Sequence, residues 1–230
     1  MLFLAALPRL PSGASLELTV PGYGRGFGTG GALWPAASVL CGYLTQQELS
    51  GLAVVEIGCG TGAVGIYAAA LGAGSVVLSD MSSSLCNCAA DNVQANRVHY
   101  EDTPVVCRTF SWGSRPVTQL LSASGSIDLV IGSDVTYRPV AYPSLCKTLA
   151  DLLEQSAAPA EAASQNRSPP SPRAVLAHQH RPLTALLNQV DALERLEEAA
   201  DEQGLALSVV QEVWRNPFSK VSLVEITRRC

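Results

Sequence analysis

The chain has 230 residues, of which 47% are hydrophobic and only 15% are charged, so it is long and apolar enough to bury a sizeable core. Its 15 basic residues, of which only Lys147 and Lys220 are lysines, stand against 20 acidic residues and give a net charge of −5. This balance argues against a nucleic-acid partner, because nucleic acids are held by clustered basic side chains. We expect a single domain over residues 1–230.

The cysteines and the apolar runs bear on where the protein is found. Seven cysteines without a CxxC pair favour reduced thiols in an intracellular protein over a disulfide framework. The apolar start, residues 1–7, has no basic segment and is interrupted at Pro8, so it is a weak candidate for a signal peptide. No run reaches the roughly 18 apolar residues of a membrane helix. We therefore expect a soluble protein without a membrane partner, located in the cytoplasm or also in the nucleus.

Most of the chain alternates short β-branched runs with Ala- and Leu-rich stretches, which predicts a doubly wound, mostly parallel α/β sheet. An Ala-rich helix opened by Trp34 comes first. Strands with both faces buried are then expected at residues 52–57, 75–79, 105–110, 127–131 and 174–177. Helices are expected between them at residues 63–71, 82–96 and 142–154, with Gly72 and Gly74 placed to end the first.

The last part of the chain departs from this alternation. A helix at residues 183–203 is followed by strands at residues 207–213 and 221–227. A short turn at Asn216-Pro217 joins these strands, which predicts an antiparallel hairpin at the end of the sheet.

Residues 155–173 are rich in Ala, Ser and Pro and have no apolar periodicity. We expect them to form a disordered insertion loop between a helix and a strand. The Ser-Pro dipeptides at Ser168 and Ser171 would alternatively mark a phosphorylation or docking motif, but such short motifs occur easily by chance, so a plain linker is favoured.

The most informative stretch is a hydrophobic strand that runs into a glycine-rich turn at residues 58–62 and then into a helix. This is the setting of a nucleotide-type cofactor loop, in which glycines allow close approach and N–H groups at the helix start point at the ligand. Asp80 ends the next strand about 20 residues later, the spacing of an acidic side chain that binds ribose hydroxyls. The alternative is a turn that only joins a strand to a helix.

An acidic residue before the turn bears on the choice between two cofactors. Gly58, Gly60 and Ala63 fit the loose dinucleotide pattern G-x-G-x-x-A, so the spacing allows NAD as well as S-adenosylmethionine (SAM). Glu56 would face a dianionic pyrophosphate unfavourably, whereas it would favour the ammonium and sulfonium groups of SAM. The charge therefore favours SAM.

A second set of polar residues follows the strand expected at residues 127–131. This strand delivers Asp134 and Tyr137 to its carboxyl end, where ligands of open α/β sheets bind. The alternative is that Asp134 caps the helix after Pro139 or a nearby turn, and that Tyr137 packs at the rim.

Two tryptophans lie close to these motifs in the sequence. Trp112 follows the strand at residues 105–110 and could form a wall beside an adenine, while Trp34 could cover the cofactor from the start of its helix. For both indoles, simple packing in the core is the alternative.

Taken together, the motifs resemble those of a known family. In chain order they read GTGGALWPAA, VVEIGCGTGAVGI, LSD, FSWG and IDLVIGSDVTY, within residues 28–154. This order resembles the seven-stranded, methyltransferase-like protein-lysine methyltransferases, which carry an N-terminal Trp, a glycine motif, a Trp-Gly motif and a D-x-x-Y motif. The resemblance implies a Rossmann-like class I methyltransferase fold with SAM as the cofactor.

The resemblance also implies roles for single residues. Glu56 belongs to the glycine motif, and Asp134 and Tyr137 match the D-x-x-Y element near the methyl acceptor. The residues implied to contact SAM are Trp34, Gly58, Cys59, Gly60, Asp80, Trp112 and Ser133. Cys59 is a departure, because relatives often have a small residue such as Ala there. The insertion at residues 155–173 is a second departure, and it could alter access of the substrate.

Two histidines follow the strand at residues 174–177. His178 and His180 would share one face if the strand continued through them. Because no third ligand is evident, packing or substrate contact is favoured over a metal site, and we expect no bound metal.

We therefore expect a SAM-dependent enzyme that transfers methyl to a lysine side chain of a non-histone protein. Because the unperturbed pKa of lysine is about 10.4, the site must desolvate the amine and direct it with acceptors such as Asp134 and the Tyr137 hydroxyl. Two alternatives stay open. The acceptor could be arginine, histidine or a small molecule, or the protein could be a non-catalytic binding module that keeps the fold.

Overall fold

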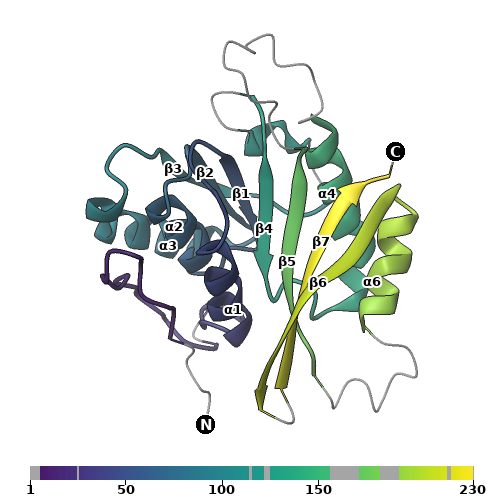
Figure 1. The fold of residues 1–230 in the computed structure, drawn as a ribbon, viewed down its shortest axis with the longest axis horizontal. Helices are drawn as coiled ribbons and strands as arrows, with labels where there is room; N and C mark the ends of the chain where they lie inside the picture. Colours follow the sequence, from purple (N-terminus) through teal and green to yellow (C-terminus); the bar gives the residue numbers. More distant parts are fainter. Residues whose placement is uncertain are drawn as a thin grey trace.

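The computed structural model describes residues 6–24, 26–113, 116–121, 125–155, 171–181, 192–216 and 219–229. These residues form a seven-stranded sheet with the strand order β3-β2-β1-β4-β5-β7-β6, flanked by helices (Figure 1). Of the weak signal-peptide candidate at residues 1–7, residues 1–5 lie outside the described part of the chain. Among the helices of the described residues, none combines the length and the apolar character that spanning a bilayer requires.

Five strands of the sheet run parallel. They are β1 (Ala53–Ile57), β2 (Ser75–Asp80), β3 (Val105–Thr109), β4 (Leu129–Ser133) and β5 (Arg173–Gln179). At the β5 edge the sheet continues with an antiparallel pair, β7 (Ser219–Arg228) and β6 (Leu205–Asn216). The predicted fold class, a mostly parallel doubly wound sheet with a C-terminal antiparallel hairpin, is confirmed.

The helices cover the two faces of the sheet in separate groups. One apolar cluster joins the sheet to α1 (Pro35–Leu44), α2 (Ala63–Ala70) and the buried side of α3 (Ser83–Ala95). The other joins the opposite face to α4 (Tyr142–Gln155) and α6 (Ala192–Asp201). Neighbouring strand residues point to opposite clusters, as the alternation of side chains along a strand requires. Short 3₁₀ turns complete the described elements at Arg97–His99, Val117–Leu120 and Pro139–Ala141.

Four expectations about the elements need correction. Strand β3 is not buried on both faces, because it is the edge of the sheet and pairs only with β2. The predicted strand at residues 127–131 begins at Leu129 and continues to Ser133, so Asp134 follows it directly. The last helix ends at Asp201, before the predicted end at residue 203, and its predicted start lies outside the described residues.

The fourth correction concerns the predicted insertion loop at residues 155–173. Gln155 is the last residue of α4 and Arg173 is the first residue of β5, so both ends belong to regular elements. Residues 156–170 lie outside the described part of the chain, and the expectation about them stays a prediction.

An N-terminal segment, residues 14–20, runs extended beside α3, in a part of the chain for which no element was predicted. Asn92 accepts a hydrogen bond from the Thr19 N–H (2.7 Å) and donates one to the Thr19 carbonyl (3.1 Å). Asn96, one helical turn later, makes the same pair of bonds to Glu17 (2.8 and 2.6 Å). Two side-chain amides thus satisfy a strand-like backbone in place of a neighbouring strand. This clamp holds the start of the loop that leads to Trp34.

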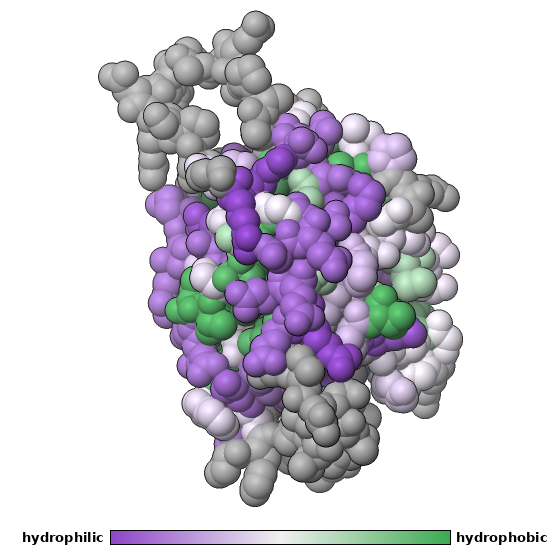
Figure 2. Space-filling view, turned by 90° about the vertical axis from the view of Figure 1, so that its right-hand side faces the viewer, coloured by the Kyte–Doolittle hydropathy of each residue, from purple (hydrophilic) through white to green (hydrophobic). Residues whose placement is uncertain are grey.

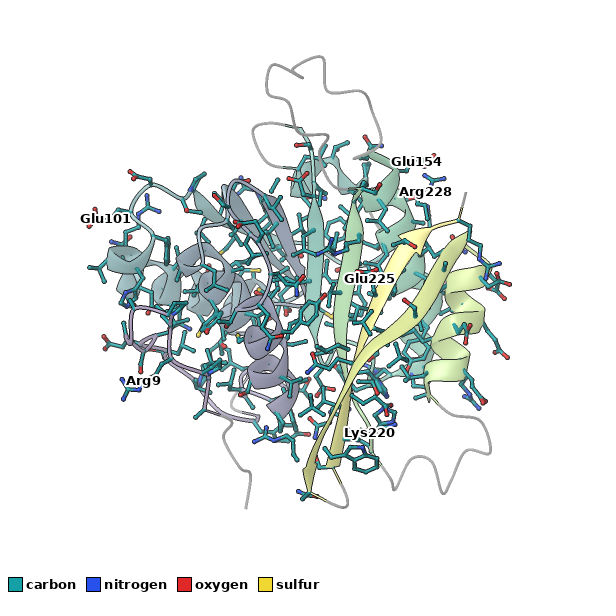
Figure 3. The ribbon with its side chains drawn as sticks, in the orientation of Figure 1. Arg9, Glu101, Glu154, Lys220, Glu225 and Arg228 are labelled. Atoms are coloured by element: carbon teal, nitrogen blue, oxygen red, sulfur yellow. The ribbon has the colours of Figure 1, made fainter. Side chains whose placement is uncertain are left out.

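An ion pair at one end of β7 and a backbone hydrogen bond at the other tie the hairpin to the rest of the molecule. Figure 3 shows Arg228 near Glu154 at one end of β7, and the two side chains form an ion pair of 3.2 Å. Lys220 lies at the other end of β7, and its backbone carbonyl accepts a hydrogen bond from the backbone N–H of His180, just after β5. The outer side of the hairpin and α6 is mostly hydrophilic with small separate apolar patches (Figure 2), as an unpaired sheet edge in solvent requires.

Candidate functional site

A cavity of about 810 Å³ lies at the carboxyl ends of β1, β2 and β4, where ligands of open α/β sheets bind. All ten residues that the sequence placed in the site line this one cavity, although they come from distant parts of the chain. They are Trp34, Glu56, Gly58, Cys59, Gly60, Asp80, Trp112, Ser133, Asp134 and Tyr137. The structure brings these side chains and turns together, and their contacts with a ligand stay predictions.

The turn between β1 and α2 requires glycine at Gly58 for two reasons. Its φ is +62°, which side chains rarely adopt, and a Cβ at this position would lie 2.8 Å from Val135 and 3.3 Å from the Trp112 ring. Trp112 therefore packs directly over the turn from the loop after β3. This position agrees with the predicted wall of the site.

Glu56 has a structural contact that the sequence did not predict. Its side chain is 1% exposed and accepts a hydrogen bond from the Gly65 N–H in the first turn of α2 (2.8 Å). The N-cap residue of α2, Gly62, has no side chain, so Glu56 performs the capping from β1. The expectation that the N–H groups at this helix start are free for a ligand is therefore wrong for Gly65. Burial raises the pKa of Glu56 to about 8 despite this bond.

Asp80, the last residue of β2, connects the glycine turn to the next loop. One carboxylate oxygen accepts from the Gly60 N–H (3.1 Å) and the other accepts from the Ser82 N–H (3.0 Å). Burial raises the pKa of Asp80, and the hydrogen bonds from backbone N–H groups oppose this shift. The carboxylate is thus fixed at the edge of the cavity, where the ribose-binding acid was predicted.

Trp34 and Tyr137 reach the cavity from two segments that Thr29 connects. The indole of Trp34 donates a hydrogen bond to the Thr29 carbonyl (2.9 Å), and the Thr29 hydroxyl lies 3.3 Å from the Tyr137 hydroxyl. Trp34 is the N-cap residue of α1, as predicted, so its backbone position is set by that helix. Thr29 was absent from the predicted site, and no signal in the sequence marked it.

Asp134 adopts a backbone conformation that few residues with side chains adopt. Its φ is +55°, and its backbone N–H donates to the Ala177 carbonyl on β5 (2.8 Å). Asp134 does not cap the turn that begins at Pro139, because that turn has Arg138 as its N-cap residue and no side-chain cap, and the Asp134 carboxylate is bound instead by the Arg181 guanidinium (2.9 and 2.5 Å). Burial raises the pKa of Asp134, whereas Arg181 lowers it. The alternative that Tyr137 only packs at the rim leaves out a polar contact, because its hydroxyl lies within hydrogen-bond distance of the Thr29 hydroxyl at the cavity.

His178 and His180, at the carboxyl end of β5, lie next to the turn at residues 134–137, and the centres of their rings are 4.8 Å apart in an edge-to-face arrangement. The buried ring of His178 shares a hydrogen bond with the Thr136 hydroxyl (2.7 Å), and His180 shares one with the Ser222 hydroxyl (2.8 Å). Within the described residues there is no group of three or more His, Cys, Asp or Glu side chains that could hold a metal ion. His178 therefore supports Thr136, which stands between Asp134 and Tyr137.

The remaining predicted residues differ in exposure. Ser133 is the half-buried last residue of β4. The Cys59 side chain is buried in the hydrophobic core, and burial raises the pKa of its thiol well above the ordinary value. A neutral, enclosed thiol behaves as a small apolar side chain, so the difference from Ala at this position needs no chemical role.

The strand order 3-2-1-4-5-7-6 and a cavity at the carboxyl ends of the parallel strands define the Rossmann-like fold of the class I methyltransferases. The fold is similar to that of magnesium protoporphyrin IX methyltransferase from Synechocystis PCC 6803, solved with bound SAH, with a TM-score of 0.56. The two proteins are 20% identical, and the match covers 84% of this chain and 81% of the other.

The family is shown by the sequence comparison. The family model described as lysine methyltransferase matches residues 13–171, and the chain belongs to this family. It is 38% identical over 139 residues to EEF1A lysine methyltransferase 3 from Xenopus tropicalis, a match that covers 60% of this chain and 58% of that protein. It is also 38% identical over 131 residues to protein N-lysine methyltransferase METTL21A from Mus musculus, covering 56% and 57%. The match thus spans a little over half the length of these relatives.

Proposed function

We propose that the chain is a SAM-dependent methyltransferase that transfers a methyl group to a lysine side chain of a non-histone protein. The observation that carries this proposal is the single cavity that joins the glycine turn and Asp80 to Asp134 and Tyr137. Family membership and the names of the relatives, which are protein-lysine methyltransferases, support the choice of lysine as the acceptor.

The residues present fit SAM as the cofactor. The cavity is within the roughly 300–1,000 Å³ range of small-molecule sites, and it carries two buried acids, Glu56 and Asp80, on the side of the glycine turn. A cationic ligand would favour the ionised form of Glu56, whose pKa burial raises to about 8, whereas a pyrophosphate would meet the Asp80 carboxylate and disfavour that form. When bound, SAM supplies a methyl group activated by the sulfonium. Asp80 would hold the ribose hydroxyls, and Trp34 and Trp112 would enclose the cofactor.

The acceptor side of the cavity is suited to a cation that must lose a proton. Asp134 is buried and fixed by its backbone bond to β5, and Tyr137, three residues later, lines the same cavity. Tyr142 donates a hydrogen bond to the Thr136 carbonyl (2.7 Å), so the short turn that carries both residues is held from α4. The Asp134 and Tyr137 oxygens would orient the lysine amine, and the Asp134 carboxylate would take its proton before methyl transfer. Positioning of the amine against the methyl group would then accelerate the reaction.

Two measurements test the proposal. Calorimetry with SAM should show micromolar binding by the wild-type chain and much weaker binding by Asp80→Ala. Incubation of the purified chain with methyl-labelled SAM and a cell extract should place the label on lysine. A label on arginine, histidine or a small molecule would replace the acceptor class, and an absence of SAM binding would favour a non-catalytic binding module.

We also propose that residues 1–230 form one domain that acts in the cytoplasm. The cysteines among the described residues are free, and five of the six are buried, which supports a reducing compartment. Limited proteolysis followed by mass spectrometry tests the domain, and fractionation of cells that express a tagged chain tests the location.

A further inference from the structure

Arg181 lines the cavity on the side of Asp134 and Tyr137. Its two terminal nitrogens bind the two carboxylate oxygens of Asp134, at 2.9 and 2.5 Å. The guanidinium carbon lies 5.7 Å from the centre of the Trp34 ring and 5.9 Å from that of Tyr137. A carboxylate and two aromatic rings therefore surround one cationic head, which comes from the end of β5.

This arrangement is a cation cage with an occupant from the same chain. Aromatic faces and a buried carboxylate attract alkylammonium groups as well as guanidinium groups. The side chain of Arg181 is 31% exposed, whereas that of Asp134 is 3% exposed. The arginine can therefore withdraw toward solvent, while the acid and its partner rings stay in place.

We propose that Arg181 is a built-in competitor of the methyl acceptor, which occupies the cage in the resting protein and is displaced when a lysine ammonium enters. The inference rests on the proposed function, since it assigns the acceptor cation to this cage. The exchange replaces one cation by another, so Asp134 never stands unpaired in a buried site, which would be costly.

The displacement also prepares the proton transfer. Arg181 lowers the pKa of Asp134 and burial raises it, so Asp134 becomes more basic once the guanidinium has left. An N–H bond of the lysine ammonium then breaks, an O–H bond forms on Asp134, and the neutral amine keeps the lone pair. The buried pair changes from two opposite charges to two neutral groups, and no other reactant is needed.

The test measures binding to the cage without methyl transfer. The probe is n-butylammonium chloride, and n-butanol is the uncharged control of equal length. Binding is followed by the indole N–H signal of Trp34 in a ¹⁵N-correlated NMR spectrum, with the signal assigned from its loss in Trp34→Phe. Arg181→Gln should bind n-butylammonium about tenfold more tightly than the wild type does, while n-butanol should not distinguish them.

Two further variants complete the design. Arg181→Lys keeps a cation in the cage and should bind n-butylammonium as weakly as the wild type. Arg108→Gln, which removes an exposed arginine from the edge strand β3, should also match the wild type. Equal or weaker binding of n-butylammonium by a folded Arg181→Gln protein would overturn the proposal that Arg181 competes with the methyl acceptor. Calorimetry with SAM on the same samples tests the proposed function separately.

Discussion

The carbonyl oxygen of Gly30 lies where a side chain on Gly60 would have to go. A Cβ built on Gly60 would be 2.6 Å from this oxygen, and Gly60 has a φ of +53°. In return, a Cβ on Gly30 would be 3.6 Å from the Gly60 Cα and 2.5 Å from the Leu85 side chain. The loop that carries Trp34 is thus packed directly on the glycine turn, backbone against backbone.

This contact predicts the effect of Gly60→Ala. The methyl group must displace the backbone of the N-terminal loop and adopt an unfavourable φ, so we expect SAM binding to weaken by at least about 100-fold. Calorimetry measures the loss. Gly72→Ala is the matched control, because Gly72 also has a positive φ (+95°) but no atom within 4 Å of its Cβ position. It should lower stability by about 1 kcal/mol and leave SAM affinity unchanged. A similar loss of affinity in both variants would contradict the packing argument.

The raised pKa of Glu56 predicts that SAM binding depends on pH. With a pKa of about 8, Glu56 is mostly protonated at pH 6.5, and a cationic cofactor binds the ionised form better. Affinity should therefore rise as the pH rises toward 8, by up to about tenfold per pH unit, and level off above it. Calorimetry in two buffers of different ionisation enthalpy should also detect proton release on binding.

The control for this prediction is Glu56→Gln, which keeps an oxygen for the Gly65 N–H but cannot ionise. Its SAM affinity should be independent of pH between 6 and 8.5. A wild-type SAM affinity that falls with rising pH would contradict the predicted direction of the pH dependence.

The division of the cavity predicts opposite effects for its two sides. Tyr137→Phe removes one hydroxyl near the acceptor and should lower turnover about 10- to 100-fold with less than a threefold change in SAM affinity. Asp80→Ala removes the acceptor of the Gly60 N–H in the glycine turn and of the Ser82 N–H in the next loop, and it should weaken SAM binding more than it lowers turnover at saturating SAM. Turnover of the labelled substrate and calorimetry separate the two. Equal losses of SAM binding in both variants would rule out this division.

The sequence predicts much of this architecture because local patterns and long-range packing agree. The parallel strands each contain a short apolar run, and Gly58 and Asp80 occur at a spacing that the βαβ unit imposes. The edge position of β3 was missed because it is set by pairing and not by its own residues, which read like those of a buried strand. The residues of a strand alone do not show whether it lies at the edge of the sheet.

The partners of the site residues were less predictable than the residues themselves. Arg181 meets Asp134 only because β4 and β5 are neighbours, and this register was not part of the sequence pattern. Glu56 caps α2 because Gly62 cannot, a compensation between residues on different elements. The alternating Leu16 and Leu18 beside polar neighbours did carry a usable signal of an extended segment, and the helical spacing of Asn92 and Asn96 marked its partner.

Asn92 carries the last prediction, since it joins the N-terminal segment to the glycine turn. Besides its two bonds to Thr19, its amide donates a hydrogen bond to the Thr61 carbonyl (2.9 Å), and its side chain is almost fully buried. Asn92→Ala removes the hydrogen-bond partner of the Thr19 N–H and the amide donors to the Thr19 and Thr61 carbonyls, of which the first keeps the weak Cys88 thiol donor, so we expect a loss of about 2–3 kcal/mol in the free energy of unfolding. Urea denaturation measures this loss. Asn87→Ala, an exposed change on the same helix, should cost less than about 0.5 kcal/mol. If the two variants were equally stable, the clamp would not hold the N-terminal segment against the site.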